Sequence, residues 1–354
     1  MTPMPHANRV LSTMRSIMFS THDFDEASFT RANKDIGHDI TFVRPRLDST
    51  TAGLARGFDA VIVAVEDQLD EVVLKRLGIF GARLVALRIK GFDNVDLAAA
   101  ERIGLRVVRV PNYSPYSVAE YVFALALSLS RHIPESQRRT RDENFRIDGL
   151  LGTELFGKTF GIVGMGRIGM AVARIACGFG CEVLAFDIKP APMTAKSAPV
   201  TWAPLDEVIR KADILSLHAP LTPETHHMIN AQRLALMKAN AILINTARGG
   251  LIDTAAMIEA LKSGKLRAAG IDVYELEGKS FDHDLSNRIL ADDVLARLLT
   301  FSNVVVTPHM AFLTEEALKD IADTTLSSLT SFEKGEVLKS EVKARPKPEF
   351  ANVF

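Results

Sequence analysis

The sequence is poor in cysteine and has no excess of charge of either sign. Its 354 residues include only Cys177 and Cys181, on either side of a Gly-Phe-Gly turn. Two cysteines are too few for a disulfide framework or a zinc cluster, and they favour a reducing compartment. The 42 Lys and Arg residues nearly balance the 43 Asp and Glu residues, giving a formal net charge of −1. The charge therefore gives no reason to expect nucleic acid or an anionic membrane as a partner.

Long hydrophobic runs are also lacking. The longest apolar stretch, Val118–Leu129, contains Glu120 and is too short to cross a bilayer, so we expect a buried helix or a helix at a subunit contact. Met1–Ser12 has no apolar core of the kind found in signal peptides. These features predict a cytoplasmic protein without a membrane partner.

Several catalytic patterns are missing as well. There is no Gly-x-Ser-x-Gly elbow, no Cys–His pair, and no basic run with interleaved aromatic residues. His226 and His227 are adjacent but have no carboxylate or cysteine at metal-ligand spacing, so we expect surface residues and no metal. These absences argue against covalent catalysis, metal catalysis and nucleic-acid binding.

The most informative feature present is a glycine motif in the middle of the chain. A β-branched stretch, Thr159–Val163, runs into Gly-x-Gly-x-x-Gly, and Met170–Ala176 continues as a helical pattern. Gly164 permits a tight turn, Gly166 lets the backbone approach a pyrophosphate, and Gly169 lets the helix pack on the strand. The helix N-terminus then offers N–H groups to the phosphates.

An acidic residue follows at the distance expected of a dinucleotide site. A second strand, Glu182–Phe186, ends in Asp187, 18 residues after Gly169. A carboxylate there meets the ribose hydroxyls and repels a 2′-phosphate. The motif therefore predicts a dinucleotide-binding domain that favours NAD over NADP.

Strands and helices alternate after the motif, with helix N-caps predicted at Asn230 and Asp253 and a C-terminal Gly264. This alternation predicts a doubly wound parallel sheet. The six expected strands are Thr159–Val163, Glu182–Phe186, Ile214–Leu217, Ala241–Asn245, Ala269–Val273 and Val304–Thr307.

The first part of the chain shows the same alternation without a glycine motif. Asp96 is expected to cap a helix that Gly104 ends, and 311–334 reads as a further helix. We predict that a cofactor domain, 112–308, is inserted into a discontinuous substrate domain, 1–111 and 309–354. The strands expected in the substrate domain are Ser16–Ser20, Ala60–Ala64, Leu84–Arg88 and Arg106–Val110.

Polar residues at strand ends are the candidates for chemistry, because ligands of open α/β sheets bind beyond the carboxyl ends of the strands. Arg248 offers a guanidinium fork that can hold a carboxylate by two hydrogen bonds, although a surface ion pair is an equal alternative. His309 can exchange a proton with a hydroxyl or carbonyl oxygen. This combination suits hydride transfer between NAD and a 2-oxo or 2-hydroxy acid.

A carboxylate beside an imidazole would raise the pKa of the histidine and fix its tautomer. From spacing alone, Glu275 and Glu277 are equal candidates for this role. Asp272 has either an electrostatic role in the site or a structural role as a cap of neighbouring backbone. His218 either lines the cofactor site or has a purely structural role.

With these residues placed, the chain from about 86 to 335 resembles the D-isomer-specific 2-hydroxyacid dehydrogenases, and most closely their fermentative D-lactate dehydrogenase branch. The diagnostic strings include Val-Asp-Leu-Ala-Ala-Ala at 95–100, Val-Val-Arg-Val-Pro-Asn-Tyr-Ser-Pro at 107–115, Asn-Phe-Arg-Ile-Asp-Gly-Leu-Leu-Gly at 144–152, Leu-His-Ala-Pro-Leu-Thr-Pro-Glu-Thr at 217–225, Ile-Asn-Thr-Ala-Arg-Gly at 244–249 and Asp-Asp-Val-Leu-Ala-Arg-Leu at 292–298.

The resemblance implies roles for individual residues and a site between the two domains. Arg248 would grip the substrate carboxylate, His309 would exchange the proton, and Glu277 would hold the imidazolium. A homodimer or homotetramer is expected. The cofactor site is expected to comprise Gly164, Gly166, Arg167, Ile168, Gly169, Asp187, His218, Pro220, Thr246, Ala247 and Asp272.

The expected substrate pocket departs from the lactate branch at two positions. It comprises Lys90, Gly91, Tyr113 and Phe312, and Lys90 stands where lactate enzymes usually carry a small residue. A lysine there favours a dianionic or inorganic substrate, as in the distantly related phosphite dehydrogenases, unless it points to solvent or pairs with an acidic neighbour. Met310 replaces the usual glutamine after the histidine and makes the pocket rim more apolar. A non-enzymatic, NAD(H)-sensing corepressor is a further alternative on the same fold.

Overall fold

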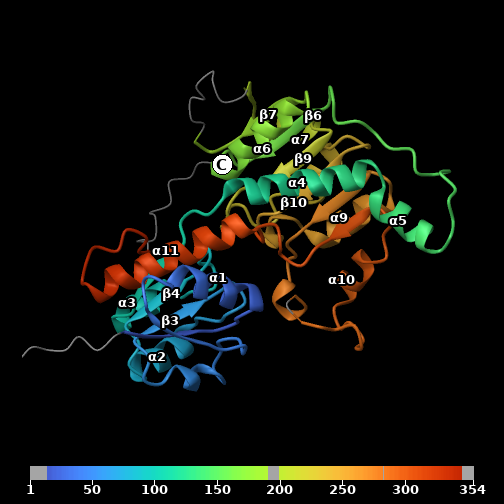
Figure 1. Ribbon diagram of the computed structural model, residues 1–354. Coiled ribbons are helices and arrows are strands. Elements are labelled where there is room, and N and C mark those ends of the chain that lie inside the picture. The colour runs from blue at the N-terminus through green and yellow to red at the C-terminus, as the bar shows by residue number, and fades with distance from the viewer. Residues whose placement is uncertain (1–13, 190–198, 282, 345–354) are drawn as a thin grey trace, which may run out of the picture. The chain divides into compact units, whose positions relative to one another are not determined.

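The chain folds into two compact units, each built on its own parallel sheet (Figure 1). The computed structural model describes residues 14–189, 199–281 and 283–344, so the stretch Met1–Ser12 lies outside the described residues. One unit contains the described residues up to Tyr113 and those from Thr314 onward. The other runs from Ser114 to Leu313.

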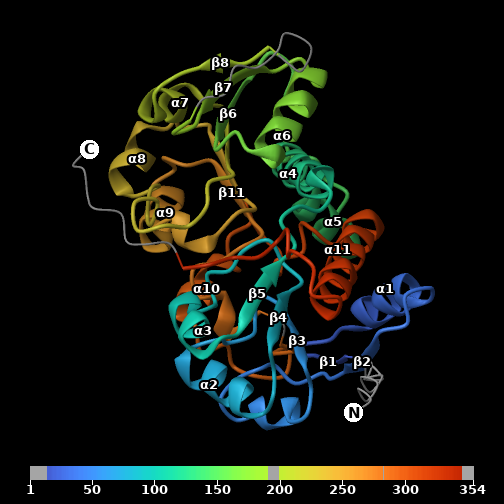
Figure 2. The same ribbon diagram turned by 90° about the vertical axis from the view of Figure 1, so that its left-hand side faces the viewer.

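The first unit has a five-stranded sheet in the order β2-β1-β3-β4-β5, and every neighbouring pair is parallel. Its helices α2 and α3 contact one another, as do α1 and α11, which lie side by side in Figure 2. In chain order its elements are β1 (Arg15–Met18), α1 (Asp23–Asn33), β2 (Asp39–Phe42), a 3-10 turn (Ala52–Ala55), β3 (Ala60–Val63), α2 (Glu71–Ile79), β4 (Leu84–Leu87), α3 (Leu97–Ile103), β5 (Arg106–Arg109) and α11 (Glu315–Glu333).

The four predicted strands of this unit are present within one or two residues of their expected bounds. β3 and β4 are buried at every residue, which is typical of parallel strands covered on both faces. The predicted cap is confirmed: the Asp96 carboxylate accepts from the Ala99 N–H, and α3 ends at Gly104 with φ +80°. β2 was missed because it is an edge strand whose residues are half-buried or exposed.

The second unit has a seven-stranded parallel sheet in the order β12-β11-β10-β9-β6-β7-β8. The prediction of six strands was wrong by one, because β8 is a two-residue edge strand without an apolar run. In chain order the elements are α4 (Pro115–Ser130), α5 (Ile133–Arg141), β6 (Thr159–Val163), α6 (Arg167–Gly178), β7 (Glu182–Phe186), β8 (Thr201–Trp202), α7 (Leu205–Lys211), β9 (Ile214–Leu217), α8 (Ala231–Leu236), β10 (Ile242–Asn245), a 3-10 turn (Gly249–Leu251), α9 (Thr254–Lys262), β11 (Ala268–Ile271), a 3-10 turn (Glu277–Lys279), α10 (Asp293–Leu298) and β12 (Val304–Val306).

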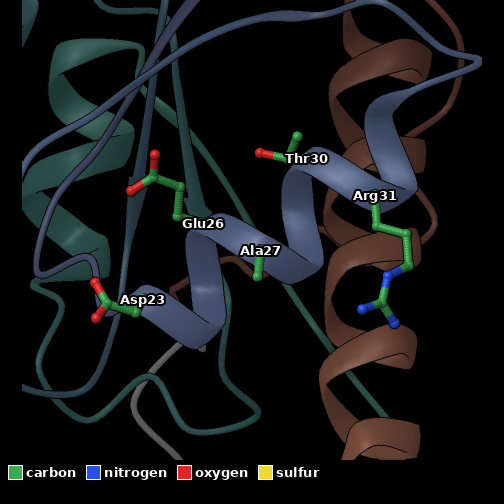
Figure 3. A pocket seen from close by; sticks show the side chains of 5 residues that line it. All are labelled: Asp23, Glu26, Ala27, Thr30 and Arg31. Carbon is green, nitrogen blue, oxygen red and sulfur yellow. The ribbon is translucent and has the colours of Figure 1, made fainter.

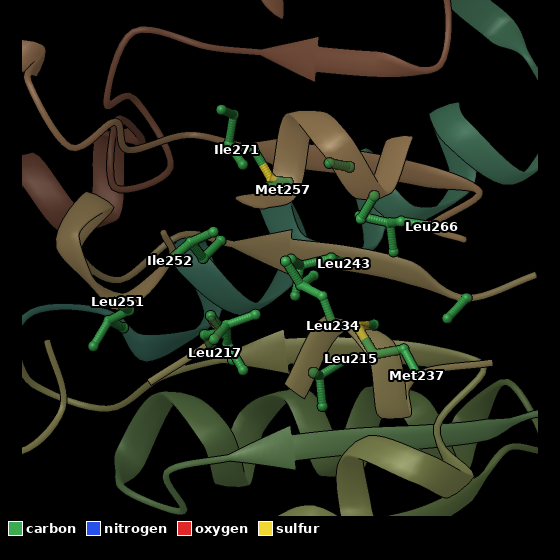
Figure 4. Packing of buried hydrophobic residues seen from close by; sticks show 14 of the residues in the cluster. Leu215, Leu217, Leu234, Met237, Leu243, Leu251, Ile252, Met257, Leu266 and Ile271 are labelled. Atoms are coloured by element: carbon green, nitrogen blue, oxygen red, sulfur yellow. The ribbon is translucent and has the colours of Figure 1, made fainter. Parts of the chain in front are cut away.

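Both faces of this sheet are buried by separate hydrophobic clusters. Alternate strand residues point to opposite faces, so Leu215 and Leu243 join one cluster while Ile214 and Ile242 join the other. Figure 4 shows the first of these clusters, which includes residues of α8 and α9. The second includes residues of α4 and α6. The predicted doubly wound fold is thus confirmed.

Helix α4 contains the longest apolar stretch of the sequence. Val122, Phe123 and Leu125 are among its buried residues and belong to the core of its own unit. Within the described residues, we find no helix that combines the length and the apolar character needed to span a membrane. Cys177 and Cys181 are both free; Cys181 is buried and Cys177 is half-buried.

Candidate functional site

The candidate residues of the second unit collect at one edge of its sheet. Asp187, His218 and Asp272 directly follow β7, β9 and β11, while Arg248 and His309 lie three residues beyond β10 and β12. Because all seven strands are parallel, these positions share the carboxyl edge. The chain reverses its winding direction between the neighbouring strands β6 and β9, and such switch points are where α/β sheets bind ligands.

The three motif glycines meet different surroundings at this switch point. A Cβ atom on Gly164, whose φ is +97°, would lie 2.7 Å from the carbonyl carbon of His218. A Cβ on Gly169 would lie 2.1 Å from the Gly164 oxygen. A Cβ on Gly166, the N-cap of α6, would meet no atom within 4 Å. Two glycines therefore permit close packing, while the third leaves open space at a helix N-terminus that suits a phosphate.

Asp187 connects the end of β7 to the glycine turn. Its Oδ2 accepts a hydrogen bond from the Met165 N–H at 2.7 Å, and its Oδ1 accepts one from the Lys189 N–H at 2.9 Å. A carboxylate oxygen can accept more than one hydrogen bond, so this arrangement leaves capacity for ribose hydroxyls.

The turn that presents Arg248 is held by Asn245, a residue that sequence reasoning did not single out. The fully buried Asn245 accepts from the Ala247 N–H at 3.0 Å and donates to the Arg248 carbonyl at 2.8 Å. Thr246 lies between them, and its buried Oγ1 has no hydrogen-bond partner among the described residues. An unsatisfied buried hydroxyl is rare in a folded protein, and here it fits a hydrogen bond to a bound ligand.

His309 and Glu277 form a hydrogen-bonded pair. His309 Nδ1 lies 3.0 Å from Glu277 Oε1, and each side chain is 23% exposed. Glu277 Oε2 accepts from the Tyr274 N–H at 3.0 Å, which fixes the carboxylate. Spacing alone left Glu275 and Glu277 equal; the structure places Glu277 beside His309, whereas Glu275 contacts His227 and Thr254.

The backbone around His309 is organised by Asp272. This buried carboxylate accepts from the Thr307 hydroxyl at 2.6 Å and from the N–H groups of Met310 and Ala311 at 2.9 Å each. His309, at φ +55°, donates its own N–H to the Asp272 carbonyl at 2.8 Å. Burial raises the pKa of Asp272, against the lowering effect of these hydrogen bonds and of His309. The geometry thus shows that Asp272 caps neighbouring backbone.

The electrostatics of this loop favour a protonated His309. Burial acts to lower its pKa, and the nearby charge of Arg248 acts in the same direction. The hydrogen bond and negative charge of Glu277, together with the charge of Asp272, outweigh both effects, so the pKa is raised above its usual value of 6.5. Such a group can hold or release a proton near neutral pH.

The remaining candidates are distributed between the two units. His218 Nε2 lies 2.8 Å from Ser216 Oγ, and Pro220 accepts from the Thr225 hydroxyl at 2.7 Å. Phe312 follows the Asp272-bound loop and is half-buried. The first unit contains Lys90, which is exposed, and Gly91 and Tyr113, which are half-buried.

The first unit also has a surface hollow, and none of the candidate residues lines it. It is lined by residues of α1 alone, as Figure 3 shows: Asp23, Glu26, Ala27, Thr30 and Arg31. None of them was a candidate for chemistry, and a hollow along one exposed helix does not enclose a ligand.

Features of the second unit fit a dinucleotide. The glycine turn leaves space at a helix N-terminus, Asp187 lies beside that turn, and Thr246 offers an unsatisfied hydroxyl. The helix N-terminus suits the pyrophosphate of NAD, Asp187 suits a ribose, and the hydroxyl of Thr246 suits another polar group of the cofactor. Arg248, Glu277 and His309 follow at the same edge of the sheet.

Comparison with known proteins agrees with this interpretation. The model of the "D-isomer specific 2-hydroxyacid dehydrogenase, NAD binding domain" matches residues 123–311. The chain is 46% identical to a 2-hydroxyacid dehydrogenase homolog of Zymomonas mobilis, covering 91% of this chain and 98% of the relative. It is 43% identical to the D-lactate dehydrogenase of Escherichia coli, over 93% and 100% of the two chains.

A solved structure is equally similar. The pyruvate reductase of Chlamydomonas reinhardtii superposes with a TM-score of 0.87 at 42% identity, covering 93% of this chain and 99% of that one. The prediction of an enzyme is thus confirmed. The chain belongs to the D-isomer-specific 2-hydroxyacid dehydrogenases, oxidoreductases that act on CH–OH groups through an NAD-binding domain.

Proposed function

We propose that the protein reduces a 2-oxo acid, either pyruvate or a slightly larger acid, to the D-2-hydroxy acid with NADH, and catalyses the reverse reaction with NAD. The observation that carries this proposal is the His309–Glu277 pair on the same sheet edge as Arg248. The relatives described as a D-lactate dehydrogenase and a pyruvate reductase support a small substrate. The unit from Ser114 to Leu313 would be the cofactor domain, and the other unit the substrate domain.

Arg248 would bind and orient the substrate. Its guanidinium remains charged at any relevant pH and can donate two parallel hydrogen bonds to a carboxylate. Asn245 holds the Arg248 backbone, and Gly249 brings it against the Tyr274–Glu275 peptide, where a Cβ would lie 2.1–2.4 Å from backbone atoms. The backbone of Arg248 would therefore already be fixed before the substrate binds.

His309 would move the proton that accompanies reduction. When bound, the nicotinamide cofactor supplies or accepts the hydride. The imidazolium of His309 would donate a proton to the substrate oxygen during reduction, and the neutral ring would accept it back during oxidation. Glu277 would hold Nδ1, which leaves Nε2 for the substrate.

The pH dependence of reduction tests the role of Glu277. Because Glu277 raises the pKa of His309, reduction should persist above pH 6.5 and decline as the pH rises through the raised pKa. In Glu277→Gln the negative charge is lost, so the decline in kcat/KM should move to lower pH. Profiles of kcat/KM against pH for both proteins would show this shift, and coincident profiles would contradict the assignment.

Cofactor choice tests the role of Asp187. Asp187→Asn keeps an oxygen acceptor for the Met165 N–H but removes the charge that repels a 2′-phosphate. The preference for NADH over NADPH, measured as the ratio of kcat/KM values, should fall at least tenfold. Asp213→Asn is the matched control, because that carboxylate also accepts a backbone N–H, from Thr159, but precedes β9 at the opposite edge of the sheet. A ratio that is equally changed in both variants would refute the role.

A substrate panel tests the proposed function as a whole. NADH oxidation would be followed with pyruvate, 2-oxobutyrate, phenylpyruvate, glyoxylate, hydroxypyruvate and oxaloacetate, and NAD reduction with phosphite. Preference for pyruvate or 2-oxobutyrate supports the proposal. Preference for oxaloacetate or phosphite would favour the alternative in which Lys90 selects a dianion, and absence of turnover with every 2-oxo acid would overturn the proposal.

We also propose an oligomeric state and a compartment for the protein. We expect a homodimer or homotetramer, because the resemblance described above implies an oligomer. The two free cysteines suit a reducing compartment such as the cytoplasm.

A further inference from the structure

Two adjacent histidines outside the proposed catalytic residues point to the same side of their loop. His226 and His227 follow a turn between β9 and α8, and their rings stack with centroids 3.9 Å apart at an interplanar angle of 24°. Neighbouring side chains on extended backbone point in opposite directions. Here His227 has a left-handed φ of +51°, and the two imidazoles lie together.

A carboxylate from a distant part of the sequence completes the group. Glu275 follows β11, and its Oε1 lies 2.5 Å from His227 Nε2. Its other oxygen, Oε2, accepts from the Thr254 hydroxyl at 3.0 Å, which orients the carboxylate toward the histidines. One ligand atom from each of His226, His227 and Glu275 lies within 4.8 Å of the other two.

The loop that carries the histidines is fixed by backbone contacts. The His227 N–H donates to the Gly250 carbonyl at 2.8 Å, and the His226 N–H donates to the Thr222 carbonyl at 2.9 Å. The backbone that carries the two histidines is therefore held in place before any ion binds. The side chains of His227 and Glu275 remain 33% and 26% exposed, so an ion can reach them from solvent.

We propose that His226, His227 and Glu275 form a binding site for a divalent transition-metal ion of the zinc class. Two imidazole nitrogens and one carboxylate oxygen are a ligand set that zinc accepts, with water in a fourth position. The ion would displace to solvent the proton that joins His227 Nε2 to Glu275 Oε1, and these two atoms would move apart from 2.5 Å, because zinc binds each ligand atom at about 2.0–2.2 Å. Mg²⁺ and Ca²⁺ prefer all-oxygen ligands and should not compete. The site is separate from the Glu277–His309 pair and does not depend on the proposed function.

Zinc binding to the full chain, stripped of metal with a chelator, tests this inference. Competition with a zinc-binding chromophore should give one tight site per chain. His226→Ala removes an exposed ligand without touching the His227–Glu275 hydrogen bond, and it should weaken zinc binding at least tenfold. His283→Ala, which removes another exposed histidine of the same unit, should leave binding unchanged.

Cobalt substitution gives a readout independent of enzyme activity. Co²⁺ should produce a visible absorption band in the wild-type protein and in His283→Ala, and the band should be absent from His226→Ala. Millimolar Mg²⁺ or Ca²⁺ should not remove it. Equal zinc affinity in wild type and His226→Ala would overturn the inference. Binding that survives in His226→Ala but is lost in His309→Asn would also overturn it, because the ion would then occupy the Glu277–His309 pair.

Discussion

Replacing His309 by asparagine is expected to lower kcat for 2-oxo acid reduction by about 10²–10⁴-fold, the range for loss of a positioned proton donor. Asparagine is the informative substitution because it tolerates the left-handed backbone of His309 better than alanine does. The binding of NADH, followed by its fluorescence, should change little, because the phosphate and ribose groups are assigned to other residues.

His132→Asn is the matched control for this variant. His132 also has a left-handed φ, +52°, and belongs to the same unit, but it lies before α5 with one ring nitrogen 3.2 Å from the Leu151 carbonyl. Its kcat should equal that of the wild type. An unchanged kcat in His309→Asn would remove the proton-transfer role from His309, and an equal loss in both variants would indicate a general effect of the substitution.

Replacing Arg248 by alanine should produce the other large effect, on kcat/KM. Removing one partner of a desolvated, hydrogen-bonded charge pair costs about 2–5 kcal/mol. Since about 1.4 kcal/mol corresponds to a factor of ten, kcat/KM for the 2-oxo acid should fall by roughly 30-fold to several thousand-fold. KM should rise and kcat should fall, because the arginine is expected both to bind the carboxylate and to orient the carbonyl.

Arg248→Lys separates charge from geometry. Lysine keeps the positive charge but loses the fork that donates two parallel hydrogen bonds, so its kcat/KM should lie between those of wild type and alanine variant. Arg233→Lys, a change at an arginine that donates to Asp206 and to the Met228 carbonyl, should be close to wild type. If Arg248→Ala retained the wild-type KM and kcat, the substrate carboxylate would have to be bound elsewhere.

The sequence predicts the sheets well because their strands are apolar runs separated by clear helix caps. The predicted N-caps Asn230 and Asp253 both accept a backbone N–H, and Gly264 has the left-handed φ of a helix end. The two strands that the sequence did not predict have no apolar run. β2 is a half-exposed edge strand, and β8 has only two residues.

The sequence could group the candidate residues at one edge of the sheet, but it could not predict the hydrogen bonds among them. The strand-end rule brought Arg248, Asp272 and His309 to one edge. The supporting roles of Asn245 and Thr307 depend on where a neighbouring turn places its N–H and carboxylate groups, which spacing does not reveal.

The proposed metal site of His226, His227 and Glu275 could not be found from sequence patterns for a related reason. His227 and Glu275 are 48 residues apart, and the meeting of their side chains depends on the packing of two loops. A prediction based on local ligand spacing therefore treated the histidines as surface residues.

The way Asp272 holds the His309 loop has a consequence for redesign of the enzyme. The contact at position 310 is made by the backbone N–H of Met310, not by its side chain. Any residue except proline can supply that N–H. A library at this single position can therefore vary the side chain next to His309, the proposed proton donor, while the support of the loop is retained. The side chain at position 310 can therefore be changed without loss of the hydrogen bond that anchors the loop. Position 310 is a practical starting point for changing which acid the enzyme accepts.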